Sequence, residues 1–414
     1  MRILVLTAYL PHPLSGHGGG EYVYGLVKHL SKSHDVSVVS FADEQEVELS
    51  KDLKDLPIRC HVVPRHKGKQ KSLLGNSYLL ARRMLQLAAS ILLWQPYYIS
   101  KYRNRNLAHF IAQETASTTY DIVQIEFAQM GQYARFVRSG KKIIREHDVM
   151  FRPAYRRYRK ARFIVKFLYF IEWCRWAMYE RTMTRHFHCV LTFTEQDKNL
   201  LERLTGAHNI EYNPRGIEVP EIVAGYSRRE QNSILFVGTF NHTPNVDAAF
   251  WLCSEIFPEL QKLRPNSILY IIGKNAPPHI LATAANNPGI KLLGFIPSIE
   301  EYFNRVSVFA APIRFGGGIK TKVLHAQSYG LPVVTTPIGA EGIERECVEA
   351  MIVKRESKEI VRGIMTLFND PEFARRLSES GRQAVARHYS WDFVVKDLEK
   401  VYDVMLHGST TQAL

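Results

Sequence analysis

Apolar runs alternate with helical periods along the whole 414-residue chain, and the pattern starts afresh near its middle. Such an order of strand, helix and strand predicts a parallel sheet covered by helices on both faces. In the first half, strands are predicted at Arg2–Tyr9, Asp35–Phe41, Ile122–Ile125 and Lys142–Arg145, with helices near 20–32, 78–94, 129–138 and 154–184.

The second half repeats this organisation after a segment rich in Pro, Gly and charge. The chain therefore divides into an N-terminal Rossmann-like domain (1–213), a linker (214–230), a C-terminal Rossmann-like domain (231–388) and a C-terminal helix (389–414) that could pack on the N-terminal domain. Strands are predicted at Ser233–Gly238, Ile268–Ile272, Ile290–Leu293, Val306–Ala310 and Pro332–Thr335, and helices near 246–262, 299–304, 319–329, 356–368 and 391–405.

The predicted fold class is thus α/β, with two parallel sheets facing each other across a cleft. Open sheets of this kind bind ligands at the carboxyl ends of their strands. Two glycine-rich segments lie at such ends. Gly16, Gly18, Gly19 and Gly20 follow the first strand and open a helix, where backbone amides favour an anion. A tight turn without a ligand is the alternative explanation.

The second glycine segment, APIRFGGGIKTKVLHAQSYGLPVVTT, joins a strand end to another predicted helix. The amides of Gly317, Gly318 and Ile319 would point at a phosphate. Lys320 and Lys322 flank this turn and could neutralise a diphosphate. Two positions apart on a helix they point in different directions, so one of them is expected to reach the ligand and the other to face water.

This segment, together with GTFNHTPNVDAAFW, YIIGKN, GFIPSIEEYF and HYSWDFVVKDLEKVY, resembles the retaining glycosyltransferase group 1 family (glycosyltransferase family 4-like). The resemblance covers nearly the whole chain and is most specific over 233–345. It implies the GT-B fold, a nucleotide-diphosphate sugar bound by the C-terminal domain, an acceptor bound by the N-terminal domain, and retention of anomeric configuration. It also implies no metal and no cofactor.

The same resemblance assigns roles to individual residues. His147, in the segment EHD, falls on the family's active-site histidine and is expected to contact the donor sugar, with Glu146 and Asp148 orienting its loop. The turn after the first C-domain strand, Gly238, is expected beside the donor.

Three departures from the family pattern affect the donor site. The glutamate that contacts the donor sugar is replaced by Gly317, as in close relatives, and the one that grips the ribose is replaced by His325. The family's Arg/Lys pair falls on Thr239 and Asn245, which removes two positive charges. Arg314, Lys320 or Lys322 could compensate.

Charge is distributed unevenly along the chain. All of the net charge of +14 lies in residues 1–215, which hold 33 Lys and Arg against 19 Asp and Glu. Residues 151–187 alone contain ten Lys and Arg and eleven aromatic residues. A basic aromatic helix is typical of binding to an anionic membrane surface. Further basic residues that would suit an anionic lipid-linked acceptor are Arg82, Arg83, Lys101, Arg103 and Arg105.

Other partners and compartments are less well matched. No nucleic-acid-binding module is recognisable, and a solvated helix face remains the plain alternative for 151–187. Five scattered cysteines predict reduced thiols and a cytoplasmic protein. The uncharged stretch 84–100 is at the lower limit for a membrane span and better fits a buried or interfacial helix. We therefore expect peripheral association with the inner face of the membrane.

Three functions are compatible with these residues. A glycosyltransferase acting in polysaccharide biosynthesis accounts for most of them. A catalytically weakened relative serving as a binding partner or scaffold is suggested by His325 and the missing Arg/Lys pair. A sugar-nucleotide epimerase of the same fold is the third. The base, the sugar, the acceptor and the oligomeric state are not specified by the sequence.

Overall fold

The computed structural model describes residues 1–15, 17–65 and 73–408, and the chain forms two compact units. Unit 1 comprises Met1–Gly216 and Val394–Leu414, and unit 2 comprises Ile217–Phe393. The first division falls within the segment that was predicted as a linker. The C-terminal helix α17 (Trp391–His407) is assigned to unit 1 from Val394 onward.

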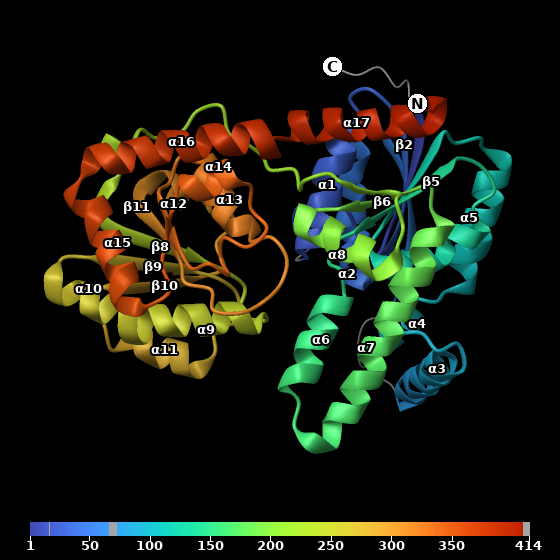
Figure 1. The fold of residues 1–414 in the computed structure, drawn as a ribbon, viewed down its shortest axis with the longest axis horizontal. Coiled ribbons are helices and arrows are strands. Elements are labelled where there is room, and N and C mark those ends of the chain that lie inside the picture. The colour runs from blue at the N-terminus through green and yellow to red at the C-terminus, as the bar shows by residue number, and fades with distance from the viewer. Residues whose placement is uncertain (16, 66–72, 409–414) are drawn as a thin grey trace. The chain divides into compact units, whose positions relative to one another are not determined.

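Unit 1 is built on a seven-stranded parallel sheet with the order β3-β2-β1-β4-β5-β6-β7. Helices cover both of its faces (Figure 1). The central strands are buried along their length because both faces are covered. The strands are β1 (Arg2–Thr7), β2 (Asp35–Ala42), β3 (Ile58–Pro64), β4 (Ile122–Glu126), β5 (Lys141–Glu146), β6 (Cys189–Thr192) and β7 (Ile210–Tyr212).

The helices of unit 1 connect these strands. They are α1 (Gly18–Leu30), α2 (Glu44–Leu49), η1 (Ser50–Asp55), α3 (Leu73–Leu92), α4 (Tyr97–Ser100), α5 (Arg105–Ser117), η2 (Ala128–Phe136), α6 (Phe151–Lys160), α7 (Phe163–Met183), η3 (Thr184–His186) and α8 (Glu195–Thr205), with α17 closing the unit.

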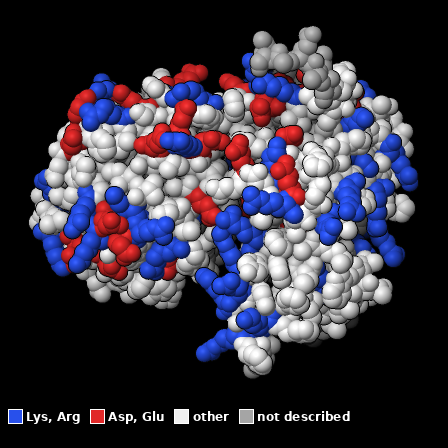
Figure 2. Space-filling model, viewed as in Figure 1, with Lys and Arg blue, Asp and Glu red and all other residues white. Residues whose placement is uncertain are grey.

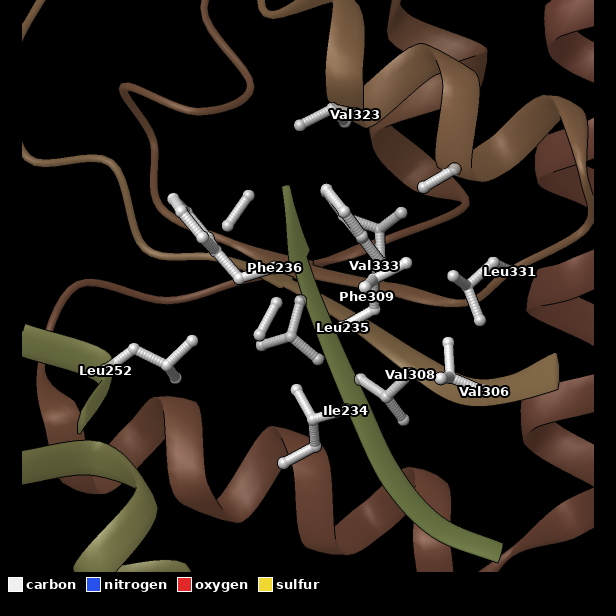
Figure 3. Close-up of a cluster of buried hydrophobic side chains, with 14 of the residues drawn as sticks. Ile234, Leu235, Phe236, Leu252, Val306, Val308, Phe309, Val323, Leu331 and Val333 are labelled. Carbon is white, nitrogen blue, oxygen red and sulfur yellow. The ribbon is translucent and has the colours of Figure 1, made fainter. Parts of the chain in front are cut away.

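Unit 2 has a six-stranded parallel sheet with the order β10-β9-β8-β11-β12-β13. Figure 3 shows Ile234, Leu235 and Phe236 of β8 packed near Val306, Val308 and Phe309 of β11 at the centre of its core. The strands are β8 (Glu230–Val237), β9 (Ile268–Ile272), β10 (Ile290–Gly294), β11 (Val306–Ala311), β12 (Val333–Thr335) and β13 (Ile352–Val353).

One 3₁₀ turn precedes the strands of unit 2, most of its helices connect them, and the last two helices follow the last strand. The helical segments are η4 (Tyr226–Arg228), α9 (Thr243–Trp251), η5 (Leu252–Ile256), α10 (Phe257–Leu263), α11 (Pro278–Ala285), α12 (Glu300–Arg305), α13 (Thr321–Ser328), α14 (Arg345–Glu349), α15 (Ser357–Asn369) and α16 (Pro371–Tyr389).

Several predicted elements differ from the structure. The helix predicted over 154–184 is two helices, α6 and α7, because the backbone becomes extended at Arg162 (φ −72°, ψ 156°). The helix predicted over 129–138 is the 3₁₀ segment η2, and 246–262 contains a π-helical turn. The prediction missed three strands of unit 1, of which β3 is half-exposed and β6 and β7 are short.

Arg229 holds unit 2 together from inside. Its side chain is buried, and its Nη1 donates to the carbonyls of Phe303 and Val306, while Nη2 donates to those of Tyr329 and Gly330. Burial lowers the pKa of this guanidinium to about 10, so it stays charged at neutral pH. One side chain thereby satisfies carbonyls at the end of α12, at the start of β11 and in the turn after α13.

Replacing Arg229 with Met should therefore destabilise unit 2 by about 3 kcal/mol, because buried carbonyls left without a donor cost about 1–3 kcal/mol each. Urea unfolding followed by circular dichroism measures this loss. The adjacent and exposed Arg228 provides the control, since Arg228→Met should change stability little. An unchanged midpoint for Arg229→Met would show that water replaces the guanidinium.

Candidate active site

His147 lies in the loop that follows β5, where the sequence placed the active-site histidine. Its ring stacks on Phe127, with centroids 3.7 Å apart, and meets the rings of Tyr22 and Phe193 edge to face. Only 10% of its side chain is exposed. The aromatic cage fixes the plane of the imidazole and leaves it a narrow opening to solvent.

Glu126, the last residue of β4, is the partner of His147. The Nε2 atom of His147 lies 2.7 Å from Oε2 of the fully buried Glu126. Burial alone would raise the pKa of Glu126, but the hydrogen bond from His147 and the nearby Arg145 outweigh it and lower that pKa. Burial lowers the pKa of His147 to about 4 despite the carboxylate. The pair is therefore a neutral imidazole donating from Nε2 to an ionised carboxylate at pH 7.

Further polar contacts hold this carboxylate in place. The Nε2 atom of Gln124 donates to Glu126 Oε1 at 2.5 Å, and Arg145 Nε lies 3.7 Å from the same oxygen. Arg145 is itself fixed by two hydrogen bonds to Asn213, at 2.9 Å and 2.6 Å. Tyr402 of α17 donates to Gln124, so the C-terminal helix also stabilises the position of Gln124 beside Glu126.

The glycines of the first turn pack closely against other residues of unit 1. A Cβ atom at Gly19 would lie 2.5 Å from the Phe127 ring, and one at Gly20 would lie 2.6 Å from the carbonyl oxygen of Leu10. Their role in donor binding remains a prediction, and Gly16 lies outside the described residues. The turn follows β1, which pairs with β4 where the strand order reverses, and open α/β sheets bind ligands at such points.

The loop that carries His147 is anchored by a carboxyl group on another helix. Both Glu180 oxygens accept from the backbone N–H of Phe151, at 3.2 Å and 3.3 Å, which caps α6. The Glu146 oxygens are buried with no hydrogen-bond partner in the described part of the chain. Burial and Glu180 raise the pKa of Glu146 well above its usual value. Glu146 and Asp148 were expected to orient the loop; the hydrogen bonds to the start of α6 come instead from Glu180.

In unit 2, four of the expected donor-site residues meet where β8 ends. The Nζ atom of Lys322 donates to Oδ1 of Asn245 at 2.7 Å, and Nδ2 of Asn245 donates to the carbonyl of Thr239 at 2.8 Å. A Cβ atom at Gly238 would lie 2.6 Å from that Nζ. The strand order of unit 2 reverses between β8 and β11, so this cluster lies at its switch point.

Lys322 is the electrostatic centre of this cluster. It is half-buried near the start of α13, with its Nζ 4.7 Å from the centroid of the Phe236 ring. Burial, together with the charge of Lys320, lowers its pKa to about 7. A bound anion would therefore favour the protonated form of Lys322.

The glycine turn before α13 is closed by its own lysine. Lys320 Nζ donates to the carbonyls of Gly317 and Gly318, at 3.2 Å and 2.5 Å. Gly318 has φ +66°, a conformation that glycine adopts without strain. Ile319 packs against the core of the unit. The helix begins at Thr321, two residues later than predicted, so its first amides follow this turn directly.

The remaining two candidates have different surroundings. Arg314 forms a bidentate ion pair with Asp247, at 2.8 Å and 2.5 Å, and its guanidinium lies over the Trp251 ring. Its charge is already paired, so the structure favours Lys322 over Arg314 as the compensating cation. His325 is half-buried one turn after Lys322 on α13, which puts the two on neighbouring positions of one helix face.

Sequence patterns missed two parts of these sites. Glu126 carries no motif, and only strand pairing brings it to His147, because β4 and β5 are neighbours with Glu126 opposite Arg145. Gly273 could have been noticed as the glycine ending YIIG. A Cβ atom there would lie 2.1 Å from the Gly238 carbonyl oxygen, so it permits the turn after β8.

Part of the second unit is similar to a known protein family. Residues 231–370 match the family described as glycosyl transferases group 1. This match, named here the group 1 segment, covers about a third of the chain. It contains β8 except for its first residue, β9 to β13, and every unit 2 residue of the cluster described above.

A sequence relative agrees with this family. Over 125 residues the chain is 26% identical to the capsular polysaccharide biosynthesis glycosyltransferase CapM of Staphylococcus aureus. The match covers 30% of this chain and spans about a third of that relative, 33% of its length.

Solved structures extend the likeness from the group 1 segment to the whole chain. Sucrose-phosphate synthase from Thermosynechococcus elongatus superposes with a TM-score of 0.70 at 15% identity, covering 99% of this chain and 100% of that one. HepE of Anabaena, in complex with UDP and glucose, gives 0.63 at 14% identity, covering 97% and 98%. These likenesses confirm the predicted GT-B fold.

The neutral state of His147 can be checked directly. Nitrogen-15 NMR of histidine-labelled protein should show His147 uncharged from pH 8 down to pH 5, with its proton on Nε2, because its pKa is lowered to about 4. Glu126→Gln should leave the ring neutral and remove the preference for that tautomer. A His147 signal that titrates near pH 6.5 would contradict the burial of this site.

Proposed function

We propose that the protein is a retaining, metal-independent glycosyltransferase that moves a hexose from a nucleotide-diphosphate donor to an acceptor. The observation that carries the proposal is the cluster of Gly238, Asn245 and Lys322 at the switch point of a group 1 segment. This cluster combines a backbone that permits close approach with a cation that is incompletely neutralised.

The diphosphate would bind between this cluster and the start of α13. The amides of Gly317, Gly318 and Ile319 would donate to phosphate oxygens, helped by the dipole of the helix. Lys322 would supply the positive charge that the family places at Thr239 and Asn245, since its Nζ already contacts Asn245. His325 would accept one hydrogen bond from the ribose, where a glutamate would accept two.

His147 would contact the transferred sugar. In its neutral form with the proton on Nε2, the Nδ1 atom is an acceptor suited to a sugar hydroxyl. Glu126 holds that tautomer and the ring orientation. We expect His147→Ala to reduce turnover by about two orders of magnitude with little change in nucleotide affinity, as for a contact made mainly in the transition state.

The pH dependence of nucleotide binding tests the donor site. A bound diphosphate favours the charged form of Lys322, whose pKa in the free protein is about 7. Affinity for UDP, measured by calorimetry, should therefore fall as pH rises above 7, by up to about tenfold per pH unit. UDP and UDP-glucose are the first ligands to test, because HepE was solved with UDP and glucose.

Two variants sharpen this test. Lys322→Met should bind UDP weakly and without dependence on pH between 7 and 9. Lys358→Met, which changes an exposed lysine of α15, should behave as the wild type. If wild-type affinity does not depend on pH, Lys322 is not part of the donor site. GDP, ADP and TDP sugars are the next ligands to measure in the same assay.

Turnover separates the three candidate functions. Sugar transfer to an acceptor, with the configuration of the product determined by NMR, supports the transferase. Binding of a nucleotide sugar without turnover would favour the scaffold, for which His325 is the motivation. Conversion of the donor in the absence of any acceptor would favour the epimerase.

The acceptor is proposed to be lipid-linked or otherwise close to a membrane, reached by a protein that associates peripherally with an anionic surface. The α6–α7 hairpin supports this. Lys and Arg side chains gather over α6 (Figure 2), and the first half of α7 exposes large apolar residues, among them Phe163, Phe167 and Leu168. Phe163 is 94% exposed. Bases beside exposed aromatics suit the interface between water and lipid.

Other aromatic residues of 151–187 have a structural role. Tyr158 stacks on Trp173 at 5.8 Å, and Phe151, Tyr155 and Phe170 surround the same indole. They pack α6 against α7. The tip of the hairpin, where α6 ends and α7 begins, stays exposed. Throughout the described ranges, no helix has the length and apolar character needed to cross a membrane.

Liposome co-sedimentation tests this association. The protein should bind anionic vesicles and not neutral ones, and salt should weaken binding, since each basic residue near an anionic surface contributes about 1 kcal/mol. Replacing Arg156, Arg157, Arg159 and Lys160 with glutamate should abolish it. The same charge change on unit 2, at Lys354, Lys358, Arg376 and Arg387, is the control. Wild-type protein that ignores anionic vesicles at low salt would refute the proposal.

A further inference from the structure

A cavity of about 350 Å³ lies in unit 1, away from the His147 cage and separate from the hairpin tip. Its floor is formed by Gly131, Ala134 and Met183, and its walls include the indole of Trp94 and the side chain of Met178. The end of α3 and the middle of α7 meet here, since Arg175 of α7 lies over the Trp94 ring at 5.0 Å. Much of the lining is thus apolar.

Two arginines line this cavity. Arg103 and Arg135 both line it, and among the ranges that the structure describes neither takes part in an ion pair. Burial and the charge of Arg135 lower the pKa of Arg103, and both side chains are exposed at the edge of the cavity. Like charges held near each other favour an anion that both can bind. Guanidinium groups match the oxygens of a phosphate in pairs.

Trp94 is held at this cavity in an unusual conformation. Its φ of +48° lies in the left-handed region, which bulky residues rarely adopt. Such strain persists where surrounding structure enforces it, and it often marks a binding site. Here it places a large flat apolar surface beside two cationic groups. The cavity therefore combines a phosphate-binding mouth with an apolar wall.

The surface next to the cavity is apolar and exposed. Along α3, Met84, Leu85, Ile91 and Leu92 recur at helical spacing on one face, and each is at least 58% exposed. Leu93, which directly follows the last residue of α3, is itself part of the lining. A ligand with a phosphate at the arginines could extend its hydrocarbon chains over this face. A free phosphate would leave all of this apolar surface uncovered.

We propose that the Arg103–Arg135 cavity binds the phosphate headgroup of a single anionic phospholipid, whose acyl chains lie along the exposed face of α3. This proposal rests on the proposed membrane association and adds one defined lipid site to it. It differs from the diffuse attraction of α6, because one defined headgroup would be held between two arginines and an indole.

A soluble short-chain lipid tests the cavity without a membrane. Calorimetry with monomeric dihexanoyl phosphatidic acid should show saturable binding at one site. Inorganic phosphate should bind at least tenfold more weakly, since it covers no apolar surface, and dihexanoyl phosphatidylcholine should also bind weakly. Equal affinity for inorganic phosphate would reduce the cavity to a free-phosphate site, and absence of lipid binding would overturn the proposal.

Matched variants locate the binding. Arg103→Gln with Arg135→Gln should lower affinity for the lipid at least tenfold, while Arg138→Gln, an exposed arginine outside the cavity, should leave it unchanged. Trp94→Gly removes the indole from the cavity while accommodating the positive φ. It should lower lipid affinity several-fold and leave it above that of inorganic phosphate, because the apolar face of α3 remains. Unchanged lipid affinity in both variants would overturn the assignment, and thermal unfolding confirms that each remains folded.

The outcome can be told apart from that of the broader proposal. Loss of lipid binding in the arginine double variant should leave UDP binding intact, and salt-sensitive attraction to anionic vesicles through α6 should persist. Failure of vesicle binding in the wild type, with dihexanoyl phosphatidic acid still bound, would instead refute the peripheral association and retain the cavity as a site for a phosphorylated amphiphile.

Discussion

The buried carboxylate of Glu126 is the interaction on which unit 1 depends. A carboxylate removed from water is costly unless it is hydrogen-bonded and paired. Here Gln124, Arg145 and His147 supply those contacts, and Arg145 in turn needs Asn213. These groups come from β4, from β5 and the loop after it, and from the segment after β7. Satisfying one carboxylate therefore fixes the relative placement of the strand ends beside the histidine.

Unit 2 uses the same device with the opposite sign. Lys322 is partly withdrawn from water beside Asn245 and the Phe236 ring, and this lowers its pKa to about 7. A bound diphosphate would stabilise the protonated form of Lys322, because its charge is poorly solvated in the free protein. The ion pair between Arg314 and Asp247 shows the contrasting case, in which a cation is already neutralised and has less to gain from a ligand.

The excess positive charge of unit 1 has more than one physical use. On α6 the bases face solvent next to an exposed apolar helix end, whereas Arg103 and Arg135 border a cavity. Aromatic residues are divided in the same way. Trp173 and its neighbours hold α6 to α7, and Phe163 and Phe167 face outward. Composition alone cannot distinguish these roles, because each depends on which side of a helix a residue occupies.

The sequence by itself determined the α/β class, the repeat of the strand–helix pattern and the group 1 segment, because these follow from local periodicity and from contiguous motifs. It also placed His147 at a strand end and Lys322 beside a glycine turn. Only the tertiary structure decided that Glu126 is the partner of His147, that Lys322 contacts Asn245, and that 154–184 is a hairpin. Those outcomes depend on which strands pair and on contacts between buried residues that are distant in sequence. A local sequence pattern carries no information on either.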